Sequence, residues 1–197
     1  MAAHDIATIW RLPLQSASPV IIVITGPIAS GKSTVARELA RQLERVGVRA
    51  AVIDLDLVHD ALLADGSTPG DATWQLARRQ TATDAKALIG DGVAVVVAEG
   101  SFNEPSDRAA FEKELQADAA PVYVTLQVSF NEALRRARPD PTRRKSRDPE
   151  FLQTYFASRR DVLAAVPGSD LVIDTERTSA EVAVATIRRR LSLDPRG

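Results

Sequence analysis

The chain has 197 residues, 45% of them hydrophobic and 26% charged, a composition typical of one globular domain with a sizeable core. Its net charge of −1 gives no reason to expect nucleic acid or an acidic membrane as a partner. The sequence has no cysteine, which excludes disulfides and thiolate metal sites, and every apolar run is too short to cross a bilayer. We therefore expect a cytoplasmic protein, monomeric or homodimeric, that binds neither nucleic acid nor membrane.

Short apolar runs alternate with helical patterns from Val20 onward. Residues 1–19 contain Pro13 and Pro19, which break any long helix, and we interpret them as an N-terminal extension. Nearly continuous runs of Val, Ile and Ala are typical of parallel strands buried on both faces. Five such strands are expected, at residues 20–25, 50–54, 93–98, 122–128 and 171–174.

Apolar stripes with helical spacing separate these strands. One stripe runs through Val35, Leu39 and Leu43 and is closed by Gly47. Further helices are expected around residues 74–88 (closed by Gly90), 111–115, 151–166 and 179–193, the last with Ser179 as N-cap. A short helix is also expected after the fourth strand. Residues 20–197 are therefore predicted to form one doubly wound α/β domain, a five-stranded parallel sheet with helices on both faces.

Residues 26–33, Gly-Pro-Ile-Ala-Ser-Gly-Lys-Ser, match the phosphate-binding pattern G-x-x-x-x-G-K-[ST]. The motif follows an apolar strand and opens an amphipathic helix, which is the context that it requires. Glycines let the backbone wrap so that successive N–H groups point at phosphate oxygens. Lys32 is expected to reach the β- and γ-phosphates, Ser33 to bind Mg²⁺, and Thr34 to lie near the α-phosphate or to support the helix start. The candidate nucleotide-binding residues are Gly26, Ile28, Ala29, Ser30, Gly31, Lys32, Ser33 and Thr34.

This strand-loop-helix resembles the P-loop kinases of small molecules, and the likeness extends from about residue 20 to residue 193. The similar groups are shikimate kinase, adenylylsulfate kinase, chloramphenicol phosphotransferase and the uridine kinase group. The resemblance implies a P-loop NTPase fold and an ATP- and Mg²⁺-dependent transfer of phosphate to a hydroxyl of a small molecule.

Carboxylates follow two of the expected strands, where ligands bind in open α/β sheets. The resemblance implies that Asp56 contacts or deprotonates the acceptor hydroxyl and that Asp54 approaches Mg²⁺ through water. Glu99 is placed like a Walker B acid and is expected to orient Mg²⁺ and to line the acceptor site. The metal set is then Ser33, Asp54 and Glu99. Alternatively, the two aspartates cap the next helix and Glu99 is a solvated loop residue.

Two further observations concern the acceptor. His59, three residues after Asp56, either lines the acceptor site or lies on a helix surface without a role. Shikimate kinase has a run of glycines where this chain has Glu99-Gly100-Ser101-Phe102, which argues against shikimate as the substrate.

Residues 135–147 carry six arginines and one lysine, and the segment at about 138–150 is expected to be a lid. Arginine binds phosphate oxygens bidentately, so Arg143 or Arg144 is expected to act on the transferring phosphoryl group. Arg138 is a weaker candidate on the nucleotide side. A solvated basic face and an RNA-binding surface are the alternatives, and no interleaved aromatic residues favour RNA. By resemblance to shikimate kinase, Arg159 is expected to bind a substrate carboxylate, and Arg177 lies in the segment where the adenine packs.

The predicted function is therefore that of a transferase, a small-molecule kinase in which Lys32, Asp56, Arg143 and Arg144 are catalytic. A nucleoside or nucleoside monophosphate kinase is one alternative. A regulatory GTPase is another, disfavoured because the chain has no Asn-Lys-x-Asp guanine motif. A non-catalytic nucleotide-binding protein, such as a domain of an ATPase assembly, is disfavoured because the short chain lacks the extra sensor and helical regions of such assemblies.

Overall fold

The computed structural model describes residues 18–115, 120–140, 145–159 and 168–193. Within them, five parallel strands form one sheet in the order β2-β3-β1-β4-β5. The strands are β1 (Val20–Thr25), β2 (Ala50–Asp54), β3 (Val95–Glu99), β4 (Val122–Gln127) and β5 (Leu171–Asp174). The predicted five-stranded parallel α/β fold is confirmed.

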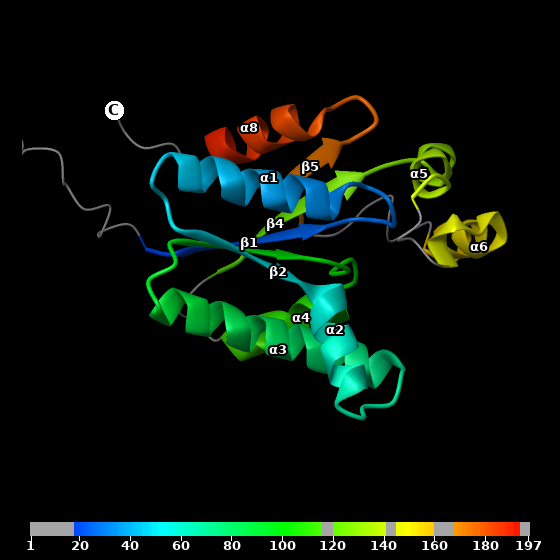
Figure 1. The fold of residues 1–197 in the computed structure, drawn as a ribbon, viewed down its shortest axis with the longest axis horizontal. Coiled ribbons are helices and arrows are strands. Elements are labelled where there is room, and N and C mark those ends of the chain that lie inside the picture. The colour runs from blue at the N-terminus through cyan, green and yellow to red at the C-terminus, as the bar shows by residue number, and fades with distance from the viewer. Residues whose placement is uncertain (1–17, 116–119, 141–144, 160–167, 194–197) are drawn as a thin grey trace, which may run out of the picture.

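Helices cover both faces of the sheet (Figure 1). On one face lie α1 (Lys32–Arg45) and α8 (Ala180–Arg190), and on the other lie α3 (Asp71–Gly90) and α4 (Pro105–Leu115). The short helix α2 (Leu55–Ala64) follows β2 directly. Beyond the carboxyl ends of the strands lie α5 (Phe130–Ala137) and α6 (Pro149–Ser158), with the 3-10 turn Lys145–Arg147 before α6.

Alternate residues of the strands fill two separate core layers, as the two-residue period of a strand requires. In β1, Ile22 and Ile24 pack against α1 and α8, whereas Ile21 and Val23 face α3 and α4. All four are at most 1% exposed, so β1 is buried on both faces. Because β1 is packed on both faces, the point at which the following loop begins has a fixed position in the structure.

Several predicted element boundaries differ from the observed ones: β4 ends at Gln127, one residue earlier than predicted, and α4 begins at Pro105 rather than at residue 111. The third strand begins at Val95 and includes Glu99, because the preceding residues turn back from α3: the N–H of Val93 bonds to the carbonyl of Leu88. Gly90 is the last residue of α3, and the turn is made at Gly92, which has a φ of 83°. The helix α6 ends at Ser158, and residues 160–166 of the predicted 151–166 helix lie outside the described residues.

Three other expectations concern the N-cap of α8, the predicted extension and lid, and membrane-spanning helices. Ser179 caps α8 by accepting a hydrogen bond from the N–H of Val182, as predicted. Residues 1–17 of the predicted extension and residues 141–144 of the predicted lid lie outside the described part of the chain. No helix in the described part has the length and apolarity needed to cross a membrane.

The packing of α1 on the sheet gives a test of the core. Leu39 is fully buried between α1 and the strands, so Leu39→Ala is expected to lower the free energy of unfolding by about 2–5 kcal/mol. Urea unfolding followed by circular dichroism measures this. The control is Arg37→Ala on the exposed side of the same helix, which should change stability by less than about 0.5 kcal/mol. Equal effects of the two substitutions would contradict the assigned core.

Candidate active site

The phosphate loop connects β1 to α1 through three residues with positive φ. These are Gly26 at 143°, Ala29 at 61° and Gly31, the N-cap of α1, at 93°. Gly31 starts the helix by accepting a hydrogen bond from the N–H of Val35 at 3.0 Å. The N-terminus of α1 therefore opens directly onto the loop, and this arrangement favours bound anions.

Lys32 folds back over this loop. Its Nζ donates hydrogen bonds to the carbonyl oxygens of Gly26 at 3.2 Å and Pro27 at 3.1 Å. A bound phosphate chain offers stronger, charged acceptors than these carbonyls. Thr34 is exposed in the first turn of α1, beside the half-buried Ser33.

Sheet register places two carboxylates side by side. Asp54 ends β2 and Glu99 ends β3, and the two residues are paired in the parallel ladder. Gly100 makes this approach close: a Cβ at this position would lie 2.5 Å from Cβ of Leu55, the first residue of α2. The Glu-Gly pair thus lets α2 start immediately beside the end of β3.

Asp54 also caps α2, so the alternative prediction of a capping role is confirmed for this residue. Its Oδ1 accepts hydrogen bonds from the N–H groups of Asp56 at 3.0 Å and Leu57 at 3.4 Å. The cap orients the first turn of α2, and this turn carries Asp56. Capping and metal binding are compatible here, because a carboxylate offers several acceptor positions.

Glu99 is 3% exposed, so the solvated-loop alternative is wrong. Burial raises its pKa to about 7, and the neighbouring Asp54 adds to this effect, while a hydrogen bond with Ser33 and the charge of Lys32 oppose it. Asp56 has an exposed side chain, but desolvation by the surrounding protein still raises its pKa, with Lys32 acting in the opposite direction. Lys32, Asp54, Asp56 and Glu99 are therefore close enough to interact electrostatically.

His59 is not a surface residue of α2. It is 7% exposed and its ring stacks on that of Trp74 from α3, with 3.7 Å between centroids and 8° between planes. Its Nδ1 lies 3.8 Å from Oδ1 of Asp60, and its Nε2 is buried without a hydrogen-bond partner. The alternative of an exposed histidine is thus wrong, and its place one turn after Asp56 remains compatible with the acceptor site.

A buried polar network supports the end of β3. Arg78 of α3 donates from Nε and Nη2 to the carbonyl of Ser101 and pairs with Asp107 at 3.0 Å. Thr25, the last residue of β1, donates to Asn103 and accepts from the N–H of Phe102. These bonds tie the segment after Glu99 to β1, α3 and α4.

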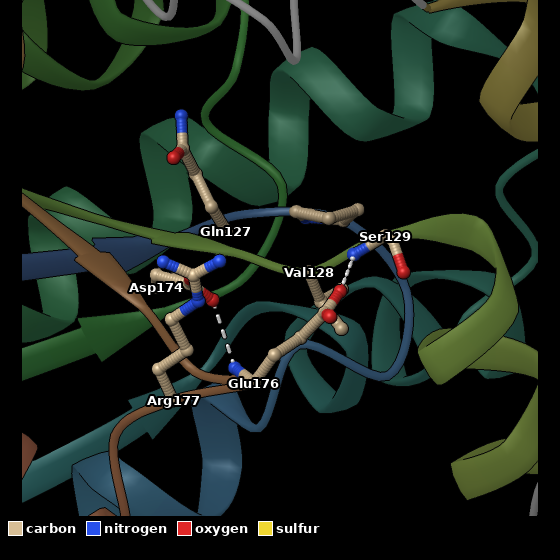
Figure 2. A pocket seen from close by; sticks show the side chains of 7 residues that line it. Gln127, Val128, Ser129, Asp174, Glu176 and Arg177 are labelled. Atoms are coloured by element: carbon tan, nitrogen blue, oxygen red, sulfur yellow. Dashed lines mark hydrogen bonds and ion pairs between the residues drawn. The ribbon is translucent and has the colours of Figure 1, made fainter.

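A pocket of about 340 Å³ opens on the other side of the phosphate loop, at the ends of β4 and β5 (Figure 2). Figure 2 shows Glu176 hydrogen-bonded to the N–H of Ser129, and Asp174 bonded to the N–H of Glu176. Arg177, predicted near the nucleotide, lines this pocket and lies 3.6 Å from Asp174. The other lining residues are Pro27, Gln127 and Val128.

Arg136 of α5 was not singled out by the sequence, although it joins the loop to this pocket. It donates to the carbonyl of Ala29 at 3.4 Å and to the hydroxyl and carbonyl of Thr175, while Glu132 on its own helix accepts from its Nε. Only its membership of the arginine cluster signalled it in the sequence.

The remaining predicted arginines are less closely tied to the site. The Arg138 carbonyl accepts a hydrogen bond from Arg147 at the base of the predicted lid. Arg143 and Arg144 lie outside the described residues. Arg159, at the end of α6, places its guanidinium 4.7 Å above the ring of Tyr155.

The oxygen donors at the ends of β2 and β3 fit Mg²⁺. Mg²⁺ prefers one or two carboxylates together with phosphates and water, and Ser33, Asp54 and Glu99 offer a hydroxyl and two carboxylates in mutual contact. In the described residues, no three His, Cys, Asp or Glu side chains gather to hold a metal by themselves. The set thus fits a cation shared with nucleotide phosphates rather than an all-protein cage.

Comparisons with known proteins agree with this geometry. The family described as AAA domain (AAA_33) matches residues 21–160. The adenylyl-sulfate kinase of Paraburkholderia xenovorans is 32% identical over 83% of this chain and 88% of its own length. The shikimate kinase of Halorhodospira halophila is 31% identical over 94% of this chain and 98% of its own. The APS kinase structure of Mycobacterium tuberculosis with AMPPNP and APS covers 89% of this chain and 98% of its own, with 21% identity and a TM-score of 0.66.

Fold and site together define a P-loop kinase, an enzyme that transfers phosphate from a nucleotide to the hydroxyl of a small molecule. The chain belongs to the AAA_33 family of AAA domains. The predicted resemblance to the shikimate and adenylylsulfate kinase group is confirmed. This family implies a nucleotide substrate and usually Mg²⁺.

The first residue of the loop is predicted to tolerate no side chain. A Cβ on Gly26 would lie 2.3 Å from the carbonyl oxygen of Leu126, which is backbone and cannot move aside cheaply. Gly26→Ala should lower the free energy of unfolding by about 2 kcal/mol more than Gly47→Ala, where φ is also positive but the space is open. Urea unfolding and ATP titration measure both variants, and equal losses would contradict the clash.

The buried Glu99 is predicted to destabilise the metal- and nucleotide-free protein as pH rises. Its pKa is raised in the folded state, so the folded protein binds the extra proton and loses stability as pH increases from about 4.5 to about 7. Glu99→Gln should therefore be neutral at pH 4.5 and more stable than the parent by roughly 2–3 kcal/mol at pH 8. Urea unfolding at both pH values checks this, and a gain that does not depend on pH would contradict the raised pKa.

Proposed function

We propose that this chain moves the γ-phosphoryl group of ATP to a hydroxyl of a small molecule bound over the carboxyl ends of β2 and β3. The observation that carries the proposal is the convergence of the phosphate loop, Asp56 and the Asp54–Glu99 pair at one edge of the sheet. Residues 20–197 act as one domain, with a lid at about 138–150.

The nucleotide would lie along the loop with its base in the pocket of Figure 2. The N–H groups at the start of α1 and the Lys32 ammonium would hold the phosphates. Arg136 supports this placement because it already spans the loop and Thr175, at the edge of the pocket. Ser33, Asp54 and Glu99 would hold Mg²⁺, which supplies neutralisation of phosphate charge when bound.

Asp56 is suited to orient the acceptor or to take its proton. The acceptor oxygen forms a bond to the γ-phosphorus as the bond from that phosphorus to the β–γ bridging oxygen breaks. The bonding electrons leave with ADP, and the hydroxyl proton passes to the Asp56 carboxylate. A raised pKa makes Asp56 a better proton acceptor than an ordinary aspartate, and the charge of the nearby Lys32 limits this rise.

The predicted arginines after α5 have two roles in this scheme, one in the lid and one at the end of α6. Arg143 or Arg144 would neutralise charge on the transferring phosphoryl group, and Arg159 would face the acceptor from α6. His59 would complete the acceptor side from α2. Closure over the site would also exclude water, which competes as an acceptor.

Two substitutions separate nucleotide binding from transfer. Lys32→Ala should lower turnover by about 100-fold or more and weaken ATP binding, because it removes the charge that meets the phosphates. Asp56→Asn should leave ATP affinity within about two-fold and lower kcat by roughly 10²–10⁴-fold. Calorimetry with ATP and Mg²⁺ gives binding, and labelled ATP with a panel of sugars, nucleosides, nucleoside monophosphates, antibiotics, shikimate and adenylyl sulfate gives transfer.

The matched controls are Lys113→Ala on the exposed side of α4 and Asp65→Asn at the end of α2, neither of which should change binding or turnover. Native turnover by Asp56→Asn would remove Asp56 from the mechanism. Thermal stabilisation by GTP but not by ATP would overturn the proposed kinase activity with ATP.

A further inference from the structure

Arg78 of α3 holds the chain where it leaves the sheet beyond Glu99. Its Nε and Nη2 donate to the carbonyl of Ser101 at 3.1 and 2.8 Å, and Nη2 also pairs with Asp107 of α4 at 3.0 Å. Arg78 is 6% exposed and Asp107 is 8% exposed, so both charges lie inside the protein. Helices α3 and α4 cover the same face of the sheet (Figure 1). One buried guanidinium thus joins these two helices to the segment after β3.

Glu99 stands at the point where the support of the sheet ends. It is the last residue of β3, and the ladder pairs it with Asp54 of β2 and Ile24 of β1. The next residue, Gly100, has a φ of 154° and no longer belongs to the strand. The position of the Glu99 carboxylate therefore depends also on how the residues after it are anchored.

The residues on either side of Ser101 are anchored to β1. Gly100 and Phe102 each donate their backbone N–H to this strand, at 3.1 and 2.9 Å. Ser101 itself is held through its carbonyl by Arg78, and hydrogen bonds from a charged donor are stronger than neutral ones. A buried ion pair adds little net stability, because the desolvation of two charges offsets their attraction. The fixed position of Ser101 therefore explains the buried Arg78–Asp107 pair better than stability does.

We propose that Arg78 is a positioning residue that keeps the carboxylate of Glu99 in the place required for Mg²⁺ beside a bound nucleotide. It acts through the Ser101 carbonyl and the backbone of Gly100, without itself contacting the metal or the nucleotide. This assignment rests on the proposed function, since it requires Glu99 to bind Mg²⁺ together with ATP. Residues that orient a metal ligand typically contribute about 10–100-fold to metal affinity.

Three substitutions separate the hold on Ser101 from the other bonds of this network. Arg78→Lys keeps a positive charge beside Asp107 but removes the paired donors on the Ser101 carbonyl, because an ammonium has no planar fork. Asp107→Asn removes the ion pair and keeps the donors on Ser101. Lys86→Ala is the matched control: Lys86 lies about two turns further along α3 and donates to a carbonyl of α4, that of Glu114, at 2.6 Å.

The measurement is the factor by which Mg²⁺ strengthens the binding of AMPPNP, obtained by calorimetry in Mg²⁺ and in EDTA. Arg78→Lys should lower this factor by about 10-fold, or to one where the wild-type factor is smaller, because Glu99 is displaced. Its affinity for AMPPNP in EDTA should stay within about two-fold of wild type, because the phosphate loop is unchanged.

The other variants isolate the cause. Asp107→Asn and Lys86→Ala should keep the Mg²⁺ factor within about two-fold, although both lower the midpoint of urea unfolding. In a Glu99→Gln background, Arg78→Lys should have no further effect on the factor, because both substitutions act on one carboxylate. This lack of additivity is what a purely structural role of Arg78 would not produce.

The outcomes separate this inference from the function that it rests on. A native Mg²⁺ factor in Arg78→Lys, where Glu99→Gln reduces that factor, overturns the inference and leaves the proposed function intact. An equal loss in Asp107→Asn overturns the hold on Ser101 as the cause. Should Arg78→Lys not fold, the double variant Arg78→Gln/Asp107→Asn leaves no unpaired buried charge and should show the same loss. Failure of Mg²⁺ to strengthen AMPPNP binding to the wild-type protein overturns the proposed function, and the inference falls with it.

Discussion

The central position of β1 in the sheet is the constraint on which the site depends. Its register with β3 and β4 brings the end of β1 between Glu99 on one side and Thr125 on the other. The loop after β1 therefore emerges between two strand ends, and α1 must return over the same face. The phosphate loop, the strand-end carboxylates and the pocket at the ends of β4 and β5 lie together because parallel strands share one carboxyl edge.

This constraint brings like charges together. Asp54 and Glu99 are paired by register, and the buried Glu99 is held in a state that favours protonation near pH 7. A sheet selected for stability alone has no use for such a pair. The repulsion between these two carboxylates has a reason if a cation and a phosphate chain complete the site, because the cation then supplies the positive charge that the protein alone lacks.

Much of this arrangement could be predicted from the sequence because it rests on local patterns. The strands are apolar runs, the loop is a contiguous motif, and Asp54 and Glu99 each come directly after the apolar run of their strand. What could not be predicted depends on packing between distant segments. The stacking of His59 on Trp74 requires α2 and α3 to meet, and the bridge from Arg136 to Thr175 requires α5 to dock beside β5. The roles of Arg143 and Arg144 remain predictions, since both lie outside the described residues.

The apolar residues within the phosphate loop explain how α5 and α6 reach it. Ala29 is buried with Ala133, Ala137 and Leu152, and Ile28 packs against the same cluster. The loop motif does not specify the residue types at its four middle positions. In this chain, Ile28 and Ala29 occupy two of them and bury apolar surface against the two helices. The loop thus leads into the N-terminus of α1 at Gly31, while its apolar residues anchor α5 and α6. The position of the loop and the positions of α5 and α6 are therefore joined through one close-packed contact.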